Sequence, residues 1–218
     1  MDELSREETA QRIRDLGLIA IIRGHYTSAR LRSIAQALIE GGVRLVEVTL
    51  NSEHALDGIT ALRKHLGDKS LVGAGTVRTK ADVDRALNAG AQFLVSPNFD
   101  PQSAARAFDA DILHIPGVFT PSEAQRAFAA GCRIQKLFPA DQAGPSYLKA
   151  LNGPLDDIEF VPTGGIAPDR IPSFVDAGAV AFGVASALIS GPEQSTDEVR
   201  ARAGQLVATL GKARGIGD

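Results

Sequence analysis

The sequence predicts an α/β protein, a (β/α)8 TIM barrel formed as a single domain over residues 1–218 with an extra N-terminal helix. Three observations carry this prediction. Short apolar runs recur at intervals of roughly 20 to 25 residues. Amphipathic segments with helical periodicity separate these runs, and no turn signal for an antiparallel hairpin lies between them. With 218 residues, of which 44% are hydrophobic, the chain can bury one core.

Eight apolar runs mark the expected strands, and eight parallel strands are the number that closes a barrel. The runs are residues 18–22, 45–50, 71–75, 93–96, 112–116, 134–138, 159–163 and 180–184. A doubly wound open sheet is the alternative. That fold often carries G-x-G-x-x-G after its first strand, whereas this chain reads "RGHYTSA" there.

The segments between the runs have the start and stop signals of helices. Several begin with Ser or Thr at the expected N-cap and end in "AGA", "AGC" or "GGV" just before the next strand. We expect a left-handed glycine to close these helices and turn the chain back into the sheet. Residues 5–16 form a further expected helix, which lies outside the eight units.

The composition excludes several functional classes. A net charge of −3 and a pI near 5.8, with both signs interspersed, give no reason to expect nucleic acid or an anionic membrane surface as a partner. The single cysteine, Cys132, cannot form an internal disulfide, and the four histidines lack metal-ligand spacing. No signal peptide or run of 18 apolar residues occurs. We therefore expect a cytoplasmic protein without a metal site.

Polar and aromatic side chains at the carboxyl ends of the expected strands are the candidate site residues, because barrels of this kind build their sites there. The candidates from the first six strands are Arg23, Glu47, Thr49, Asn51, Thr76, Pro97, Lys136 and Phe138.

Lys136 and Glu47 stand out because each is a charged residue inside an apolar strand. Side-chain alternation places Leu45, Glu47 and Thr49 on one face of their strand, which we expect to point into the barrel. One reading of the pair is a salt bridge that plugs the barrel. The other is catalytic, because a desolvated lysine loses its proton more easily and can attack a ketone to form a Schiff base while a carboxylate moves protons.

The last two expected strands end in residues that suit a phosphate group. Thr163, Gly164 and Gly165 expose backbone N–H groups before a segment that we expect to begin a helix, and Gly183 leads to Ser186, where we expect a second helix start. Loops after the seventh and eighth strands commonly bind phosphate in barrels. Ordinary glycine turns are the alternative reading.

Six ordered motifs resemble the KDPG and KHG aldolase family of class I pyruvate aldolases, from about residue 18 to residue 188. They are "VEVTLNS", "LVGAGTV", "VSPNFD", "PGVFTPSEA", "KLFPA" and "FVPTGGI". The resemblance implies a (β/α)8 barrel that assembles as a homotrimer and needs no metal or cofactor. It also implies cleavage of 2-keto-3-deoxy-6-phospho sugar acids to pyruvate and glyceraldehyde 3-phosphate.

The same resemblance implies a role for each candidate. Lys136 matches the Schiff-base lysine and Glu47 the general acid/base. The remaining matches are Thr76 and Pro97 beside the pyruvate moiety, Arg23 as a basic substrate-binding residue, Phe138 as the aromatic wall of the ketimine, and Thr163, Gly164, Gly165 and Ser186 as phosphate-binding residues.

One departure bears on the substrate. The gluconate-type branch tends to carry an arginine just after "EVTL", whereas this chain has Asn51 and Ser52 and resembles the galactonate-type branch there and in "GPSYLKAL". We therefore expect 2-dehydro-3-deoxy-6-phosphogalactonate as substrate. The phosphogluconate epimer and 4-hydroxy-2-oxoglutarate are alternatives, and a phosphosugar isomerase or synthase and a non-catalytic phosphometabolite-binding barrel are more distant ones.

Overall fold

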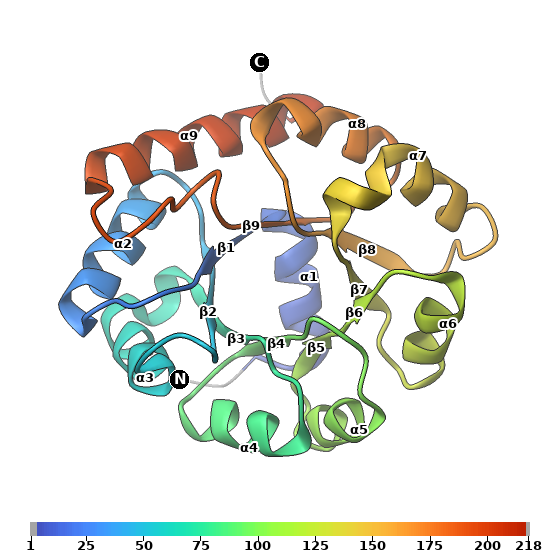
Figure 1. Ribbon diagram of the computed structural model, residues 1–218, viewed down its shortest axis with the longest axis horizontal. Coiled ribbons are helices and arrows are strands. Elements are labelled where there is room, and N and C mark those ends of the chain that lie inside the picture. The colour runs from blue at the N-terminus through green and yellow to red at the C-terminus, as the bar shows by residue number, and fades with distance from the viewer. Residues whose placement is uncertain (1–3, 217–218) are drawn as a thin grey trace.

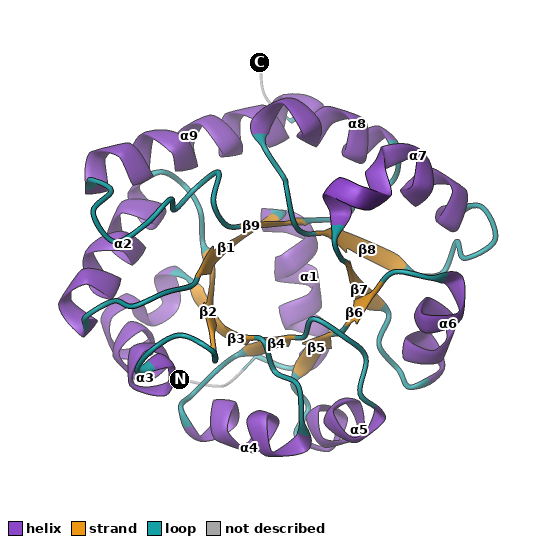
Figure 2. Cartoon of the chain, in the orientation of Figure 1, coloured by secondary structure: helices purple, strands orange, loops and turns teal. Residues whose placement is uncertain are grey.

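The computed structural model describes residues 4–216, in which short parallel strands form a ring surrounded by helices (Figures 1 and 2). All but one of the described strands lie within the predicted apolar runs, and the exception, residues 117–118, directly follows the fifth run, so the predicted α/β barrel is confirmed. The strands are β1 (Leu18–Ile22), β2 (Leu45–Thr49), β3 (Leu71–Gly75), β4 (Phe93–Val95), β5 (Leu113–Ile115), β6 (Gly117–Val118), β7 (Ile134–Leu137), β8 (Glu159–Pro162) and β9 (Phe182–Val184).

The ring closes through two seams. Six strands pair in the order β5-β4-β3-β2-β1-β9 and three in the order β6-β7-β8. Pro116, which has no N–H to donate to a ladder, ends the fifth predicted run and separates β5 from β6, which lies just beyond that run. The chain itself therefore crosses the first seam. At the second seam, Thr163 bridges to Gly183.

Helices surround the ring and close one of its ends (Figure 2). They are α1 (Arg6–Leu16), α2 (Ser28–Glu40), α3 (Ala55–Leu66), α4 (Lys80–Asn88), α5 (Pro101–Asp109), α6 (Pro121–Ala129), α7 (Ala140–Asn152), α8 (Ile171–Asp176) and α9 (Thr196–Ala213).

The predicted signals mark the helix ends. The side chains of Ser5, Thr79 and Thr120 each accept an N–H three residues on and form capping boxes at the starts of α1, α4 and α6. One glycine in each "GGV", "AGA" and "AGC" ending has a positive φ, as predicted; these are Gly42, Gly90, Gly131 and Gly178. Each such turn aims the following strand back into the ring.

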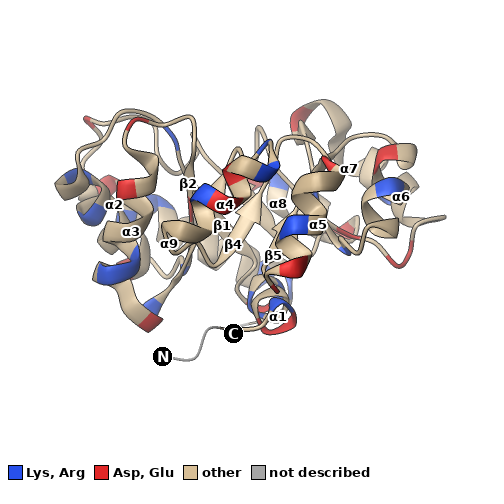
Figure 3. Cartoon of the chain, turned by 90° about the horizontal axis from the view of Figure 1, so that it is seen from below, with Lys and Arg blue, Asp and Glu red and all other residues tan. Residues whose placement is uncertain are grey.

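Helix α1 closes the amino-terminal end of the ring. Its buried residues Ala10 and Ile13 belong to one apolar cluster with inward-facing strand residues such as Ile19, Leu45 and Leu71. In Figure 1 α1 crosses behind the ring of strands, and in Figure 3 it lies at one end of the molecule. The barrel is therefore packed and apolar at this end, and its other end is the one left for a site.

The inward faces of the strands change character along the barrel axis. Leu45 is followed on the same face by Glu47 and Thr49, and Ile134 by Lys136. Val46 and Val48 pack instead with the helices, in a second cluster that includes Ile59 of α3. A two-residue step thus separates the apolar layer from the charged residues, and the predicted inward aim of Glu47 is confirmed.

Charged residues of both signs are interspersed over the helices in Figure 3. None of the helices that the structure describes combines the length and the apolar character needed to cross a membrane.

Candidate active site

Glu47 lies in the middle of β2 and is almost completely buried, with 1% of its surface exposed. Its strand neighbours at the same level are Ile21 on β1 and Gly73 on β3. One step further on β3, a Cβ on Gly75 would lie 1.8 Å from Oε1 of Glu47. The missing side chain at Gly75 is therefore what gives the carboxyl group its place.

Lys136 lies at the same depth on the opposite side of the ring, in β7, and is 4% exposed. Its strand neighbours are Gly117 on β6 and Val161 on β8. The Nζ atom lies 4.9 Å from the centre of the Phe138 ring, a distance at which an ammonium group is attracted to the ring face. Apolar and aromatic surroundings thus replace water around this amine.

Burial dominates the electrostatics of both groups. It raises the pKa of Glu47, while the positive charges of Lys136 and Arg23 act in the opposite direction. It lowers the pKa of Lys136, with Glu47 opposing this shift and Arg23 adding to it. Both shifts favour the uncharged forms, a protonated acid beside a neutral amine.

The arrangement argues against a purely structural salt bridge. No ion pair joins Glu47 to Lys136 within residues 4–216, and Oε1 of Glu47 is buried without a hydrogen-bond partner. Leaving a buried carboxyl oxygen unpaired costs free energy, so a stabilising plug would be expected to satisfy it. Unsatisfied buried groups of this kind are typical of sites that complete their bonds with a ligand.

Thr76 and Pro97 follow β3 and β4 at the same end of the barrel. Thr76 has a φ of 58°, a conformation that is unusual for a β-branched residue and is characteristic of functional sites. A Cβ on Gly117 would lie 2.4 Å from the backbone of Pro97, and Gly117 in turn pairs with Lys136. Pro97 is therefore one strand away from the lysine.

The loop after β8 presents two unused donors, the first beside Phe138 and the second beside Asp141. Gly164 and Gly165 have φ values of 98° and 65°, and no protein acceptor within the described residues takes either N–H. A Cβ on Gly164 would lie 3.4 Å from the Phe138 ring. Successive N–H groups in such turns form concave sites for anions.

Of the two expected helix starts near these loops, the one after Gly165 is present in a short form and the one at Ser186 is wrong. After Gly165 the chain forms a three-residue 3-10 helix, Pro168–Arg170, before the short α8. Ser186 lies in a hydrogen-bonded turn, in which Leu188 and Ile189 donate to the carbonyl of Ala185. The next helix, α9, begins only at Thr196. A full helix dipole therefore contributes at neither loop.

Most of the candidate residues gather at one end of the barrel. Glu47 and Lys136 share it with Arg23, whose charge acts on both, and with Phe138. Thr163 is buried there, and a Cβ on Gly183 would collide with its side chain. No described contact joins Asn51 or Ser186 to this group; Asn51 is exposed.

Sequence reasoning missed two contributors. Gly75 was read only as part of a strand, although a glycine inside a strand often marks a close approach. Ser52 was noted only as a family departure, yet its hydroxyl accepts the N–H of Gly24 at 3.0 Å and lies 2.9 Å from the hydroxyl of Thr49. Nothing in the sequence pattern reveals this contact between the loop after β1, which contains Gly24, and the turn after β2, which contains Ser52.

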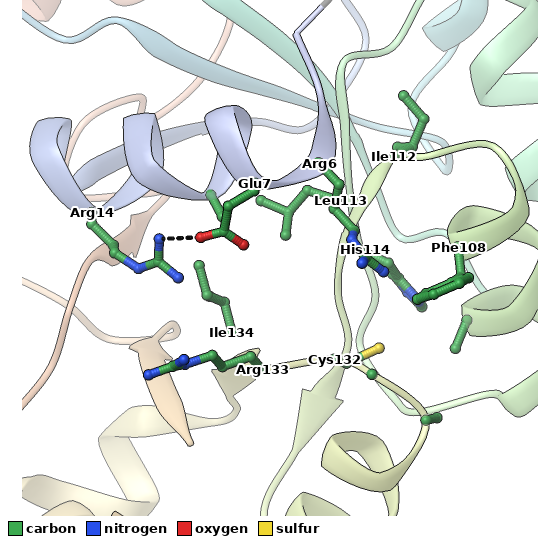
Figure 4. Close-up of a pocket in the computed structure, with 14 residues that line it drawn as sticks. Arg6, Glu7, Arg14, Phe108, Ile112, Leu113, His114, Cys132, Arg133 and Ile134 are labelled. Carbon is green, nitrogen blue, oxygen red and sulfur yellow. Dashed lines mark hydrogen bonds and ion pairs between the residues drawn. The ribbon is translucent and has the colours of Figure 1, made fainter. Parts of the chain in front are cut away.

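A second pocket lies at the other end of the barrel, beside α1, and none of the candidate residues lines it (Figure 4). Its Arg14 pairs with Glu7 at 3.1 Å, and both Arg14 and Arg133 pair with Glu159 at 2.7 Å. Burial raises the pKa of the Cys132 thiol to about 11, so the reactive thiolate is suppressed. This pocket therefore lacks an activated nucleophile.

His114 also borders the second pocket, on the outward face of β5. Its Nε2 lies 2.7 Å from Oγ of Ser96, which donates to the carbonyl of Val77. Nε2 is therefore the donor to Ser96, and Nδ1 carries no proton. Burial lowers the pKa of His114 to about 4, so the ring packs as a neutral group. Within residues 4–216, no three His, Cys, Asp or Glu side chains converge as metal ligands.

Comparison with known proteins agrees with this geometry. A profile of the family described as KDPG and KHG aldolase matches residues 9–202. A probable 2-dehydro-3-deoxy-6-phosphogalactonate aldolase of Rhizobium meliloti is 38% identical over 88% of this chain and 89% of its own length. The 2-dehydro-3-deoxy-6-phosphogalactonate aldolase of Escherichia coli is 37% identical over 79% and 84%. A 2-dehydro-3-deoxy-phosphogluconate aldolase of Treponema pallidum is 40% identical over 65% and 68%.

Solved structures give the same result. One described as native KDPGal structure superposes with a TM-score of 0.87 at 35% identity, covering 91% of this chain and 96% of its own. A KDPG aldolase from Legionella pneumophila, with pyruvate captured at low pH as a covalent carbinolamine intermediate, superposes with a TM-score of 0.78 at 25% identity, covering 94% and 97%.

The burial of His114 predicts an acid-sensitive fold. Its pKa is about 4 in the folded protein against 6.5 for a free histidine, so below pH 6.5 the unfolded chain binds the proton more readily. Stability is therefore lost as the pH falls from 6.5 through 4, by roughly 3 kcal/mol from this residue. Urea unfolding at several pH values measures the loss, and His114→Gln should make it shallower. The control, His65→Gln on the exposed face of α3, should retain the wild-type dependence; an unchanged slope in His114→Gln contradicts the assignment.

Proposed function

The chain belongs to the KDPG and KHG aldolase family, and from this premise we propose that it is a Schiff-base aldolase acting on 2-dehydro-3-deoxy-6-phosphogalactonate. The products are pyruvate and D-glyceraldehyde 3-phosphate. Membership of the family makes the protein an aldolase, a lyase of phosphorylated keto sugar acids, and removes the isomerase, synthase and non-catalytic alternatives. The exact substrate and the residue roles are the proposal.

One observation carries the proposal: a buried amine and a buried carboxyl group, unpaired with each other, share the dry interior at the open end of the barrel. Lysine attacks a ketone only as the neutral amine. The lowered pKa of Lys136 raises the fraction of that form at neutral pH. The raised pKa of Glu47 supplies an acid at the same place.

Imine formation uses both groups in their uncharged forms. The Nζ lone pair of Lys136 bonds to C2 of the substrate and gives a carbinolamine. Glu47 then donates its proton to the C2 hydroxyl group, which leaves as water, and the product is a protonated iminium ion beside a carboxylate. General acid catalysis of this kind needs the protonated carboxyl group, and burial favours that form by raising the pKa of Glu47.

Carbon–carbon cleavage uses the carboxylate that the first step leaves. Glu47 takes the proton of the C4 hydroxyl, the C3–C4 bonding electrons move into the iminium ion, and an aldehyde and a neutral enamine result. The same carboxyl group then returns the proton to C3. Hydrolysis of the iminium ion releases pyruvate and restores the neutral amine, so each proton taken is returned within one cycle.

The remaining residues fit the two ends of such a substrate. The free N–H groups of Gly164, which lies next to Phe138, and of Gly165 suit the phosphate group. Thr76 and Pro97 suit the pyruvate end, as the family resemblance implies. Legionella pneumophila KDPG aldolase, in which pyruvate was captured as a carbinolamine, supports covalent capture of pyruvate by this chain too.

The galactonate epimer is favoured by two observations. The relatives from Rhizobium meliloti and Escherichia coli, which match over most of the chain, are named for it. Asn51 and Ser52 stand where the gluconate-type branch tends to have an arginine. Phosphogluconate is the second candidate because the Treponema pallidum relative is named for it at 40% identity. The two substrates differ only in configuration at C4, which a few contacts can discriminate. The homotrimer and the cytoplasmic setting stay predictions.

A trapping experiment combined with a coupled assay tests the proposal. Borohydride with pyruvate should reduce the imine and add mass irreversibly to the peptide that contains Lys136. Lys136→Met should remove both the adduct and pyruvate release, measured with lactate dehydrogenase, because methionine has no amine. Wild-type protein should cleave the galactonate substrate with a higher kcat/KM than the gluconate one.

Each result has a contradicting outcome. If Lys136→Met forms as much borohydride-trapped adduct as the wild type, the imine forms on another residue. A higher kcat/KM with phosphogluconate would transfer the substrate assignment to the second candidate and leave the imine chemistry intact. Lys212→Met, which removes an exposed lysine on α9, is the matched control and should trap pyruvate like the wild type.

Gly75→Ala tests the placement of the acid. The new methyl group would lie 1.8 Å from the position of Glu47 Oε1, so the carboxyl group must move. A displacement of about 1 Å in a catalytic group can lower kcat by about 100-fold, and we expect a loss of that order in pyruvate release. The control is Gly204→Ala on α9, where a Cβ meets nothing within 4 Å. Full activity of Gly75→Ala in a folded protein would show that Glu47 need not stay where it is.

A further inference from the structure

Two loops at the open end of the barrel are joined by one hydroxyl group. The N–H of Gly24, in the loop after β1, donates to Oγ of Ser52 at 3.0 Å. Ser52 belongs to the turn after β2, where its own N–H donates to the carbonyl of Thr49 and its hydroxyl lies 2.9 Å from that of Thr49. Both side-chain contacts are partly buried, so the connection is shielded from competing water.

Gly24 directly follows Arg23 and has a φ of 136°, and its N–H, in the peptide group that it shares with Arg23, donates to Ser52. This conformation is one that residues with a side chain rarely adopt. The hydrogen bond therefore fixes the backbone exactly one residue beyond the arginine. Tyr26, which is 7% exposed, anchors the far end of the same loop in the outer apolar cluster.

Arg23 itself is held by little else. Its side chain is exposed, and within residues 4–216 it makes no side-chain hydrogen bond or ion pair. Its charge nevertheless reaches Glu47 and Lys136. β1, which Arg23 follows, lies between β2 and β9, and therefore between the acid and the strand that leads to Ser186. A guanidinium group whose hydrogen-bond donors are unused is suited to bind an anion.

We propose that Ser52 is a positioning residue that fixes the backbone of Gly24, so that Arg23 can meet an anionic oxygen group of the substrate, either its carboxylate or its phosphate. The inference rests on the proposed function, because it takes the same substrate in the same site. An arginine loses considerable rotamer freedom when it binds an anion. A backbone already fixed by Ser52 reduces that loss, since fewer bonds remain to be ordered.

A second tie between the loops does not replace this one. Nδ1 of His25 lies 3.0 Å from Glu53, but these side chains are 83% and 55% exposed. Exposed ion pairs of this kind contribute little to holding two segments together. Ser52 therefore bears the constraint next to Arg23.

A double-mutant cycle tests the proposal. Ser52→Ala, Arg23→Ala and the double variant are compared by KM and kcat for the cleavage of the phosphogalactonate substrate, and by the pyruvate concentration that half-saturates borohydride trapping. We expect Ser52→Ala to raise KM about tenfold, the effect of losing one hydrogen bond that orders a charged contact. The double variant should be no worse than Arg23→Ala, because both changes remove the same interaction.

Conservative variants separate positioning from folding. Ser52→Thr keeps the acceptor oxygen and should retain a KM near that of the wild type. Ser52→Cys keeps the shape with a poorer acceptor and should resemble Ser52→Ala, so it serves as the test variant if Ser52→Ala does not fold. Ser33→Ala, which removes an exposed hydroxyl from α2, is the matched control.

The outcomes are distinguishable. If Ser52→Ala raises both KM and the pyruvate concentration that half-saturates trapping, the proposal is supported and the anion is the carboxylate, which pyruvate also carries. If it raises KM alone, the proposal is supported and the anion is the phosphate. An unchanged KM in Ser52→Ala, or additive effects in the double variant, overturns it. If wild-type protein traps no pyruvate at all, the proposed function fails instead, which the Ser52 variants cannot cause.

Discussion

The exclusion of water from Lys136 and Glu47 is the constraint on which the rest of this structure depends. Each group is charged in water and is placed where its charge is penalised, and neither forms an ion pair with the other. Such an arrangement costs folding free energy. It is retained in a stable barrel because the free energy of the apolar layers around it is large enough to offset this cost.

The barrel supplies this environment by simple geometry. α1 seals one end, a layer of inward aliphatic side chains follows, and two residues further along each strand the reactive groups emerge. Glycines at positions 73, 75 and 117 make room in this part of the barrel for the Phe93 ring, the Glu47 carboxyl group and the Pro97 backbone, respectively. Loops beyond the strands add donors for anions without disturbing the dry layer. Rigid strands therefore place the chemistry, and the loops decide what reaches it.

Much of this architecture could be predicted from the sequence, because strand alternation and helix caps are local. The barrel, the first helix and the inward aim of Glu47 follow from periods of two and 3.6 residues. The division of the fifth strand at Pro116 depends on pairing with β4 on one side and with β7 on the other, which the sequence does not show. The turn at Ser186 is closed by local bonds to the carbonyl of Ala185, and no signal in the sequence distinguishes it from a helix start. The link from Ser52 to Gly24 crosses 28 residues of sequence. The contact between Gly75 and the Glu47 side chain likewise exists only once β2 and β3 are paired.

The central claim is that burial makes Lys136 a neutral amine within reach of neutral pH. Its titration can be followed by NMR of protein labelled with 13C at the lysine Cε, and the signal absent from Lys136→Met identifies it. The five other lysines are exposed and serve as internal references. The account predicts that the Lys136 signal titrates with a pKa well below the ordinary lysine value of about 10.4. Titration at or above that value, in protein that remains folded, would contradict it.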